Sequence, residues 1–354
     1  MSLGPLMVDF AGTELSADDR EVLAHPLVGS VILFSRNYRD REQLLALTGA
    51  IKALRSPSLL IGVDHEGGRV QRFRAGFTRL PPARALGRGY TEDRRAALAL
   101  AQTAGWLMAA ELRAVGVDFS FAPCVDLDYG VSEVIGDRAF HSDPDAVAAL
   151  STAYATGMRE AGMAATAKHF PGHGAVVADS HISLPVDRRT LEDLEPDLRP
   201  YRVLIENHLS AVMAAHVVFP RIDDQPASLS HRWIAGILRG QLGFHGCVFA
   251  DDLTMAGAAA AGDVVARARL AVAAGCDVLP ICNDRSAVLA VLERFRPERM
   301  NPASQARLVR MRGRGEPPLE LVATPRWQEA EAVIAALTAT PALRLTQDDG
   351  EGVG

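Results

Sequence analysis

The amino-acid sequence predicts an α/β protein, a single TIM-type (β/α)8 barrel with an extra C-terminal helix. Three observations favour this fold. The chain contains eight short apolar runs, stretches with helical periodicity separate most of them, and each run ends in polar or ionisable residues. Continuous apolar runs are typical of strands buried on both faces of a parallel sheet. A doubly wound open sheet is the alternative, but eight repeats without a G-x-G-x-x-G motif after the first run favour closure.

Each element follows from its local pattern. The apolar runs predict strands at residues 5–10, 29–34, 58–63, 117–125, 164–167, 211–215, 247–250 and 277–281. Apolar residues three and four apart predict helices at residues 41–55, 94–115, 145–161, 191–207, 231–242 and 264–274. An eighth barrel helix is expected at 286–295, and the extra helix at 327–337. We expect one domain over residues 1–345 and a disordered, Gly- and Asp-rich tail over 346–354.

Polar side chains gather at the ends of the predicted strands. In chain order they are Asp9, Arg36 with Asn37, Asp64 with Glu66, Asp126 with Asp128, Lys168 with His169, His216, Asp251 with Asp252, and Asn283. The beginnings of the strands carry few such groups. Because the active site of a (β/α)8 barrel lies at the carboxyl ends of its strands, we expect the chemistry on this rim.

Composition and charge argue against several classes of function, including nucleic-acid binding and membrane attachment. A net charge of −6 in 354 residues, with scattered arginines, offers no basic surface for nucleic acid or for an anionic membrane. The N-terminus lacks a secretory signal pattern, and no run approaches the roughly 18 apolar residues of a membrane-spanning helix. The four cysteines form no C-x-x-C motif and are expected to be buried free thiols. The sequence therefore predicts a cytoplasmic protein, and we expect a monomer.

The segment from Lys168 to His181, K-H-F-P-G-H-G-A-V-V-A-D-S-H, concentrates a lysine, three histidines and an aspartate in an expected loop. Asp179 and His181 are two residues apart, and residues with this spacing share one face of an extended segment. The carboxylate can then fix the tautomer of the imidazole and favour its protonated form. This pair is predicted to transfer protons.

Three further motifs supply candidate site residues. Asp251 and Asp252 follow the seventh run, where two adjacent carboxylates are costly without a role, and we expect one to be structural and one functional. The motif D-H-E-G-G-R-V-Q-R at 64–72 places acids and guanidinium groups around a tight glycine turn, which suits the recognition of hydroxyl groups. The motif G-D-R-A-F at 136–140 is, by itself, compatible with an ordinary surface turn.

Four histidines make a metal-dependent active site an alternative to a metal-free one. A metal-dependent barrel hydrolase would draw His and Asp ligands from several strand ends, here from among His169, His173, His181 and His216. Such enzymes commonly carry H-x-H at the end of strand one, where this chain reads V-D-F-A. We therefore expect no metal and no cofactor. His216, in A-A-H-V-V-F-P, suits a hydrogen-bonded core position nearly as well as a site.

Taken together, D-H-E-G-G-R-V-Q-R, G-D-R-A-F, K-H-F-P-G-H-G with D-S-H, and F-A-D-D-L-T-M resemble one family in order and spacing. It is the NagZ-type β-N-acetylglucosaminidases of glycoside hydrolase family 3, and the resemblance covers roughly residues 5–340. Two departures are mild. His65 stands where the family usually has Gln, and Ala250 where a Ser or Thr often precedes the aspartates.

The resemblance implies retaining hydrolysis through a covalent glycosyl-enzyme. Asp251 would be the nucleophile, and His181, tuned by Asp179, the general acid and then the general base. The hydroxyls of N-acetylglucosamine would be bound by Asp64, Arg72, Arg138, Lys168 and His169. The implied substrate is a small sugar, a muropeptide-type fragment from peptidoglycan recycling. Phosphorolysis by the same chemistry, a catalytically silent sugar-binding barrel and a metal-dependent hydrolase remain alternatives.

Overall fold

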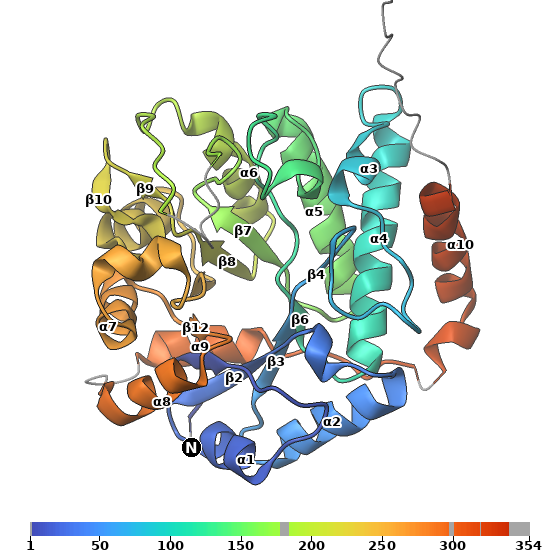
Figure 1. The fold of residues 1–354 in the computed structure, drawn as a ribbon. Helices are drawn as coiled ribbons and strands as arrows, with labels where there is room; N and C mark the ends of the chain where they lie inside the picture. The colour runs from blue at the N-terminus through green and yellow to red at the C-terminus, as the bar shows by residue number, and fades with distance from the viewer. Residues whose placement is uncertain (1, 178–183, 297–300, 319, 340–354) are drawn as a thin grey trace, which may run out of the picture.

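The computed structural model describes residues 2–177, 184–296, 301–318 and 320–339 (Figure 1). Its main strands run parallel in two sheets. The five-stranded sheet has the order β12-β1-β2-β3-β6, and its strands are β1 (Leu6–Val8), β2 (Val28–Leu33), β3 (Leu60–Val63), β6 (Phe119–Ser120) and β12 (Leu279–Ile281). The three-stranded sheet has the order β11-β8-β7, formed by β7 (Thr166–Phe170), β8 (Ala211–Ala214) and β11 (Cys247–Ala250). Each of the eight predicted runs therefore overlaps a parallel strand, although β7 extends three residues beyond the predicted end at 167 and β2 begins one residue before the predicted start at 29.

Single parallel bridges connect the two sheets at both edges. Phe119 pairs with Ala164, and Cys124 with Lys168, between β6 and β7. Phe249 pairs with Val278 between β11 and β12. The α/β class is confirmed, while the described strands form two sheets with bridged edges instead of one continuously paired barrel sheet.

Helices surround the strands on the outside (Figure 1). They are α1 (Ala17–Ala24), α2 (Arg41–Ala53), α4 (Arg94–Ala114), α5 (Pro144–Glu160), α6 (Glu195–Glu206), the π-helix η4 (Arg232–Gln241), α7 (Val264–Ala274) and α8 (Arg285–Arg294). Aspartates fix several of their first turns: the side chains of Asp40, Asp93, Asp263 and Asp284 each accept a hydrogen bond from the backbone N–H three residues ahead. Such caps satisfy backbone donors that a helix leaves unpaired at its N-terminus.

The predicted extra helix is present as α10 (Pro325–Ala339) and packs along α4 (Figure 1). Trp327 anchors it by donating from Nε1 to Oε1 of Glu111 at 3.0 Å. Several short elements were not predicted: α1, the hairpin β4 (His65–Gly67) with β5 (Val70–Gln71), α3 (Ala83–Gly87), the hairpin β9 (Val218–Phe219) with β10 (Asp223–Pro226), and α9 (Pro302–Arg310). The predicted tail at 346–354 lies outside the described residues.

Aromatic side chains fill the interior between the two sheets. Phe119 and Phe121 approach Phe249 with ring centroids 5.5 and 5.2 Å apart, and all three are buried. Lys168 lies above this cluster, with Nζ 5.8 Å from the centre of the Phe121 ring. The cluster therefore forms an apolar floor beneath the carboxyl ends of the strands. Among the described residues, no helix combines the length and the apolar character that crossing a membrane requires.

Candidate active site

A cavity of about 200 Å³ opens at the carboxyl ends of the parallel strands. Its polar lining comes from residues far apart in the sequence: Asp64, Glu66, Arg72, Arg138, Lys168, His169, His173, Asp251, Asp252 and Asn283. Apolar side chains including Phe34, Phe121, Met213 and Met255 complete the wall. The rim predicted from the strand ends is therefore where the structure places a concave, mixed polar and apolar site, the usual form of a small-molecule pocket.

Lys168 stands at the centre of a buried charge network. Its Nζ donates to Oδ1 of Asp64 at 2.8 Å and lies 2.6 Å from Oε1 of Glu66. Arg138 donates to both oxygens of Glu66, from Nη2 at 2.8 Å and from Nε at 2.9 Å. Arg72 completes the group, with Nη2 3.7 Å from Oδ2 of Asp64. Buried charges are stable only when paired in this way.

The network keeps its carboxylates ionised. Burial alone would raise the pKa of Glu66, but the charges of Arg138 and Lys168 outweigh burial and hold that pKa below its usual value. The pKa of Asp64 is lowered for the same reason, since Lys168 and Arg72 overcome the effect of burial. The cavity therefore presents fixed acceptors beside fixed donors, an arrangement that suits a ligand with several hydroxyl groups.

Adjacent residues of β7 both line the cavity. In a regular strand Lys168 and His169 would point to opposite faces. The register between β7 and β8 shifts between Lys168 and Phe170, which interrupts the alternation. His169 consequently faces Arg138, with Nε2 3.3 Å from Nη2, while its Nδ1 lies 2.7 Å from Oδ2 of Asp126. Asp126 was noticed in the sequence as a strand-end residue but was not assigned to the site.

The two aspartates after β11 have different surroundings. Asp252 accepts hydrogen bonds at Oδ1 from the backbone N–H of Thr254 and of Cys282, at 3.0 and 3.1 Å, and so ties the end of β11 to the end of β12. Burial raises its pKa to about 6. Oδ1 of Asp251 accepts from the backbone N–H of Asp252 at 2.9 Å. Asp252 therefore has the contacts expected of a structural carboxylate, although both aspartates line the cavity, and the functional role of Asp251 remains a prediction.

Two histidines have core environments. His216 is fully buried, with Nδ1 2.5 Å from the Ser228 hydroxyl and Nε2 2.9 Å from the carbonyl oxygen of Asp252. Burial lowers the pKa of His216 and so favours the neutral ring. Burial also lowers the pKa of His65 to about 3, and this ring packs against Phe73 and Phe77. For His216 the core interpretation is the better one.

Glu66 is the largest omission from the predicted site, because it contacts two of the predicted residues directly. The sequence does carry a signal for Glu66, because it lies two residues after Asp64 at the end of the third apolar run. Each predicted sugar-binding residue lines the cavity: Asp64, Arg72, Arg138, Lys168 and His169. Asp251 does so as well. Asp179 and His181 lie outside the described residues, so their predicted pairing remains a prediction.

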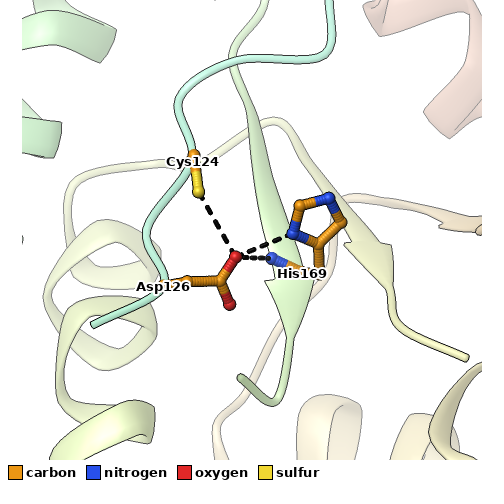
Figure 2. A group of neighbouring side chains, drawn as sticks. All are labelled: Cys124, Asp126 and His169. Carbon is orange, nitrogen blue, oxygen red and sulfur yellow. Dashed lines mark hydrogen bonds and ion pairs between the residues drawn. The ribbon is translucent and has the colours of Figure 1, made fainter. Parts of the chain in front are cut away.

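Cys124, Asp126 and His169 lie close enough to suggest a metal site (Figure 2). Their chemistry fits a hydrogen-bonded cluster better. A thiolate is the form of Cys that binds metals, whereas burial raises the pKa of Cys124 well above its usual value. Sγ of Cys124 instead lies 3.3 Å from Oδ2 of Asp126, in reach to donate. Hydrogen bonds therefore account for the short distances among these three residues.

Comparisons with known proteins point to one family. The family model described as the glycosyl hydrolase family 3 N-terminal domain matches residues 5–311. A β-hexosaminidase of Thiobacillus denitrificans is 59% identical over 314 residues, 88% of this chain and 87% of that protein. A β-hexosaminidase of Thioalkalivibrio sulfidiphilus is 54% identical over 98% of this chain and 99% of its own length. The crystal structure of NagZ from Neisseria gonorrhoeae with N-trifluoroacetyl-D-glucosamine has a TM-score of 0.91 at 44% identity, covering 96% and 99% of the two chains.

Proposed function

Because the chain belongs to glycosyl hydrolase family 3, we propose that it is a retaining exo-β-N-acetylglucosaminidase. It is a glycosidase of the β-hexosaminidase type. The observation that carries this proposal is the cavity, which Asp251 lines together with the network of Asp64, Glu66 and Lys168. A nucleophilic carboxylate next to a hydroxyl-binding network is what a retaining glycosidase requires.

We infer that the two sheets act as one (β/α)8 barrel. Their order, read through the bridges Phe119–Ala164 and Phe249–Val278, gives a circular succession of eight parallel strands. In such a barrel the carboxyl ends of all strands converge on one rim. This explains why Asp64, Lys168 and Asp251 meet in one cavity although they follow different strands.

In the proposed first step, Asp251 attacks the anomeric carbon of the terminal N-acetylglucosamine. The aglycone leaves with a proton, and the sugar stays bound to the carboxylate as an ester. The nucleophile must be ionised and oriented for this step. Support comes from the backbone N–H of Asp252, which donates to Oδ1 of Asp251 and thereby favours the charged form.

The proposed acid/base is His181 paired with Asp179. It would protonate the leaving oxygen and then remove a proton from the water that hydrolyses the ester. Most retaining glycosidases use a second carboxyl group about 5 Å from the nucleophile for these roles. A histidine, with an unperturbed pKa of about 6.5, can donate and accept protons near neutrality. The segment that leads toward this pair passes His173, which lines the cavity.

The remaining cavity residues would bind the sugar. The side chain of Asp64 is 19% exposed and can accept from a hydroxyl, while Lys168 and Arg138 can donate to neighbouring hydroxyls. The Neisseria gonorrhoeae relative was solved with N-trifluoroacetyl-D-glucosamine, a ligand closely related to the proposed N-acetylglucosamine group. We propose muropeptide fragments with this group at the non-reducing end as substrates, cleaved by a cytoplasmic monomer in peptidoglycan recycling.

Release of 4-nitrophenol from its β-N-acetylglucosaminide, with EDTA present, tests the proposal. Wild type should be active and should first release the β-anomer of N-acetylglucosamine, as retention requires. Asp251→Asn should lower kcat by at least about a thousandfold, given the cost of losing a catalytic nucleophile. Asp93→Asn, which changes the capping carboxylate of α4, is the matched control and should be fully active.

Three results would contradict the proposal. Inactive wild type would favour a silent sugar-binding barrel. Loss of activity in EDTA would favour the metal-dependent alternative. Accumulation of the sugar 1-phosphate when phosphate is supplied would replace hydrolysis by phosphorolysis.

A further inference from the structure

We propose that Asp126 is a positioning residue of this site, which sets the tautomer and orientation of His169 and fixes the backbone of His173 beside it. Asp126 itself would not touch the sugar. The inference rests on the proposed function only in the expectation that His169 contacts the substrate. The geometry of the cluster can be tested independently of any activity.

Asp126 follows β6 and its side chain is fully buried. Its two oxygens lie within hydrogen-bond distance of four donors. Oδ2 accepts from the backbone N–H of His169 at 3.2 Å, and it contacts Nδ1 of His169 at 2.7 Å and Sγ of Cys124 at 3.3 Å (Figure 2). Oδ1 accepts from the backbone N–H of His173 at 2.8 Å. One carboxylate thus holds a side chain and two backbone positions of the neighbouring β7 segment.

These contacts define the tautomer of His169. The buried Asp126 carboxylate accepts hydrogen bonds from the backbone N–H groups of His169 and His173, which favours its ionised form. An ionised carboxylate only accepts hydrogen bonds, so Nδ1 of His169 must carry the proton. On the other side of the ring, Nε2 lies 3.3 Å from Nη2 of Arg138. A guanidinium only donates, so Nε2 must accept.

The consequence is a histidine that offers an acceptor to the cavity. With Nδ1 committed to Asp126, the Nε2 lone pair can accept from Arg138 or from a ligand hydroxyl. Arg138 is held in turn by its paired contacts with Glu66. Without the Asp126 carboxylate, the ring could carry its proton on Nε2, and two donors would then face each other across the 3.3 Å contact. A carboxylate that accepts a hydrogen bond from one ring nitrogen commonly sets which nitrogen of a histidine is protonated.

Asp126→Asn tests this role because it preserves shape and removes the charge. We expect kcat/KM for the aryl N-acetylglucosaminide to fall about 10- to 100-fold, mainly through a higher KM, as for the loss of a hydrogen bond to a charged group. Asp128→Asn is the matched control. Asp128 lies two residues further on and pairs with Arg84 instead of His169, so kcat/KM should stay within about twofold of wild type.

Nitrogen-15 NMR of labelled histidines supplies the decisive readout, with the His169 signals assigned by their loss in His169→Gln. Over the pH range in which the spectra show a neutral ring, wild-type His169 should carry its proton on Nδ1, and Asp126→Asn should show a mixture or the Nε2–H form. A neutral wild-type ring with its proton on Nε2, or a ring that never becomes neutral over the pH range in which the protein is folded, would overturn the proposal even if the variant fails to fold.

Two other results would also overturn it. A changed tautomer with unchanged kcat/KM would make Asp126 merely structural. Lost activity with an unchanged tautomer would mean that Asp126 does not act through the tautomer of His169. Inactive wild type would count against the proposed function alone, because the NMR measurement still decides the role of Asp126.

Discussion

Replacing Glu66 by Gln should destabilise the protein far more than an ordinary loss of one surface charge. The Glu66 side chain is 8% exposed and has three short contacts, at 2.6 Å to Lys168 and at 2.8 and 2.9 Å to Arg138. Glutamine keeps the shape and one acceptor oxygen but leaves two buried cations without their shared counter-charge. Removing one partner of such a pair costs several kcal/mol, and we expect a loss of about 3 kcal/mol of unfolding free energy at pH 7.

Asp137→Asn is the matched control for this prediction. Asp137 neighbours Arg138 in the sequence, but its ion pair with Arg69 is 3.3 Å long and about half exposed on both sides. An exposed pair contributes at most about 1 kcal/mol. Urea unfolding of wild type and both variants, monitored by circular dichroism, measures the difference. Equal destabilisation by the two substitutions would refute the reasoning, because burial of the Glu66 network would then contribute nothing.

The pH dependence has a defined sign. The pKa of Glu66 in the folded protein is lowered from its ordinary value of 4.5 by Arg138 and Lys168, against the effect of burial. Its stabilising contribution is therefore complete above about pH 5.5 and is lost as the pH falls below 4.5. The gap between wild type and Glu66→Gln should be constant from pH 6 to 8 and should narrow toward pH 3.5. A gap that widens on acidification contradicts this assignment.

Three further predictions follow from the same contacts. Burial raises the pKa of Asp252 from 3.8 to about 6, so wild type should lose about 2 kcal/mol relative to Asp252→Asn between pH 4 and 7. Parallel urea-stability curves over that range would disprove it. Lys168→Met should lower kcat/KM at least about tenfold by leaving Asp64 and Glu66 without their shared donor, and unchanged kinetics would remove Lys168 from the site. Trp327→Phe should cost about 1 kcal/mol in urea unfolding by breaking the hydrogen bond to Glu111, and no change would mean that this bond does not hold α10 in place.

Much of the fold could be predicted because its main elements carry strong local signals. The run Cys247–Ala250 is fully apolar and forms β11 with the predicted bounds. Helix α7 also matches, with Asp263 as its N-cap and Gly275 ending it in a left-handed conformation. Helix α1 was missed because only Val22 and Leu23 of its eight residues are buried. So narrow an apolar stripe gives little periodicity to recognise.

The candidate site could be predicted only in part, because its residues depend on partners distant in the sequence. Motifs placed Asp64, Lys168 and Asp251 at strand ends, and all three line the cavity. The roles of Glu66 and Asp126 depend on Arg138 and His169, which are 72 and 43 positions away. A carboxylate at a strand end shows that a partner is needed, whereas only the folded arrangement identifies that partner.

Trapping the covalent intermediate tests the central claim most directly. The enzyme would be incubated with an activated, fluorinated N-acetylglucosaminide whose glycosyl-enzyme hydrolyses slowly, and its peptic peptides analysed by mass spectrometry. The account predicts one sugar attached to Asp251, with Asp251→Asn unlabelled. Turnover of the reagent without any adduct, or a sugar attached to another carboxylate such as Asp252 or Asp64, would contradict Asp251 as the nucleophile.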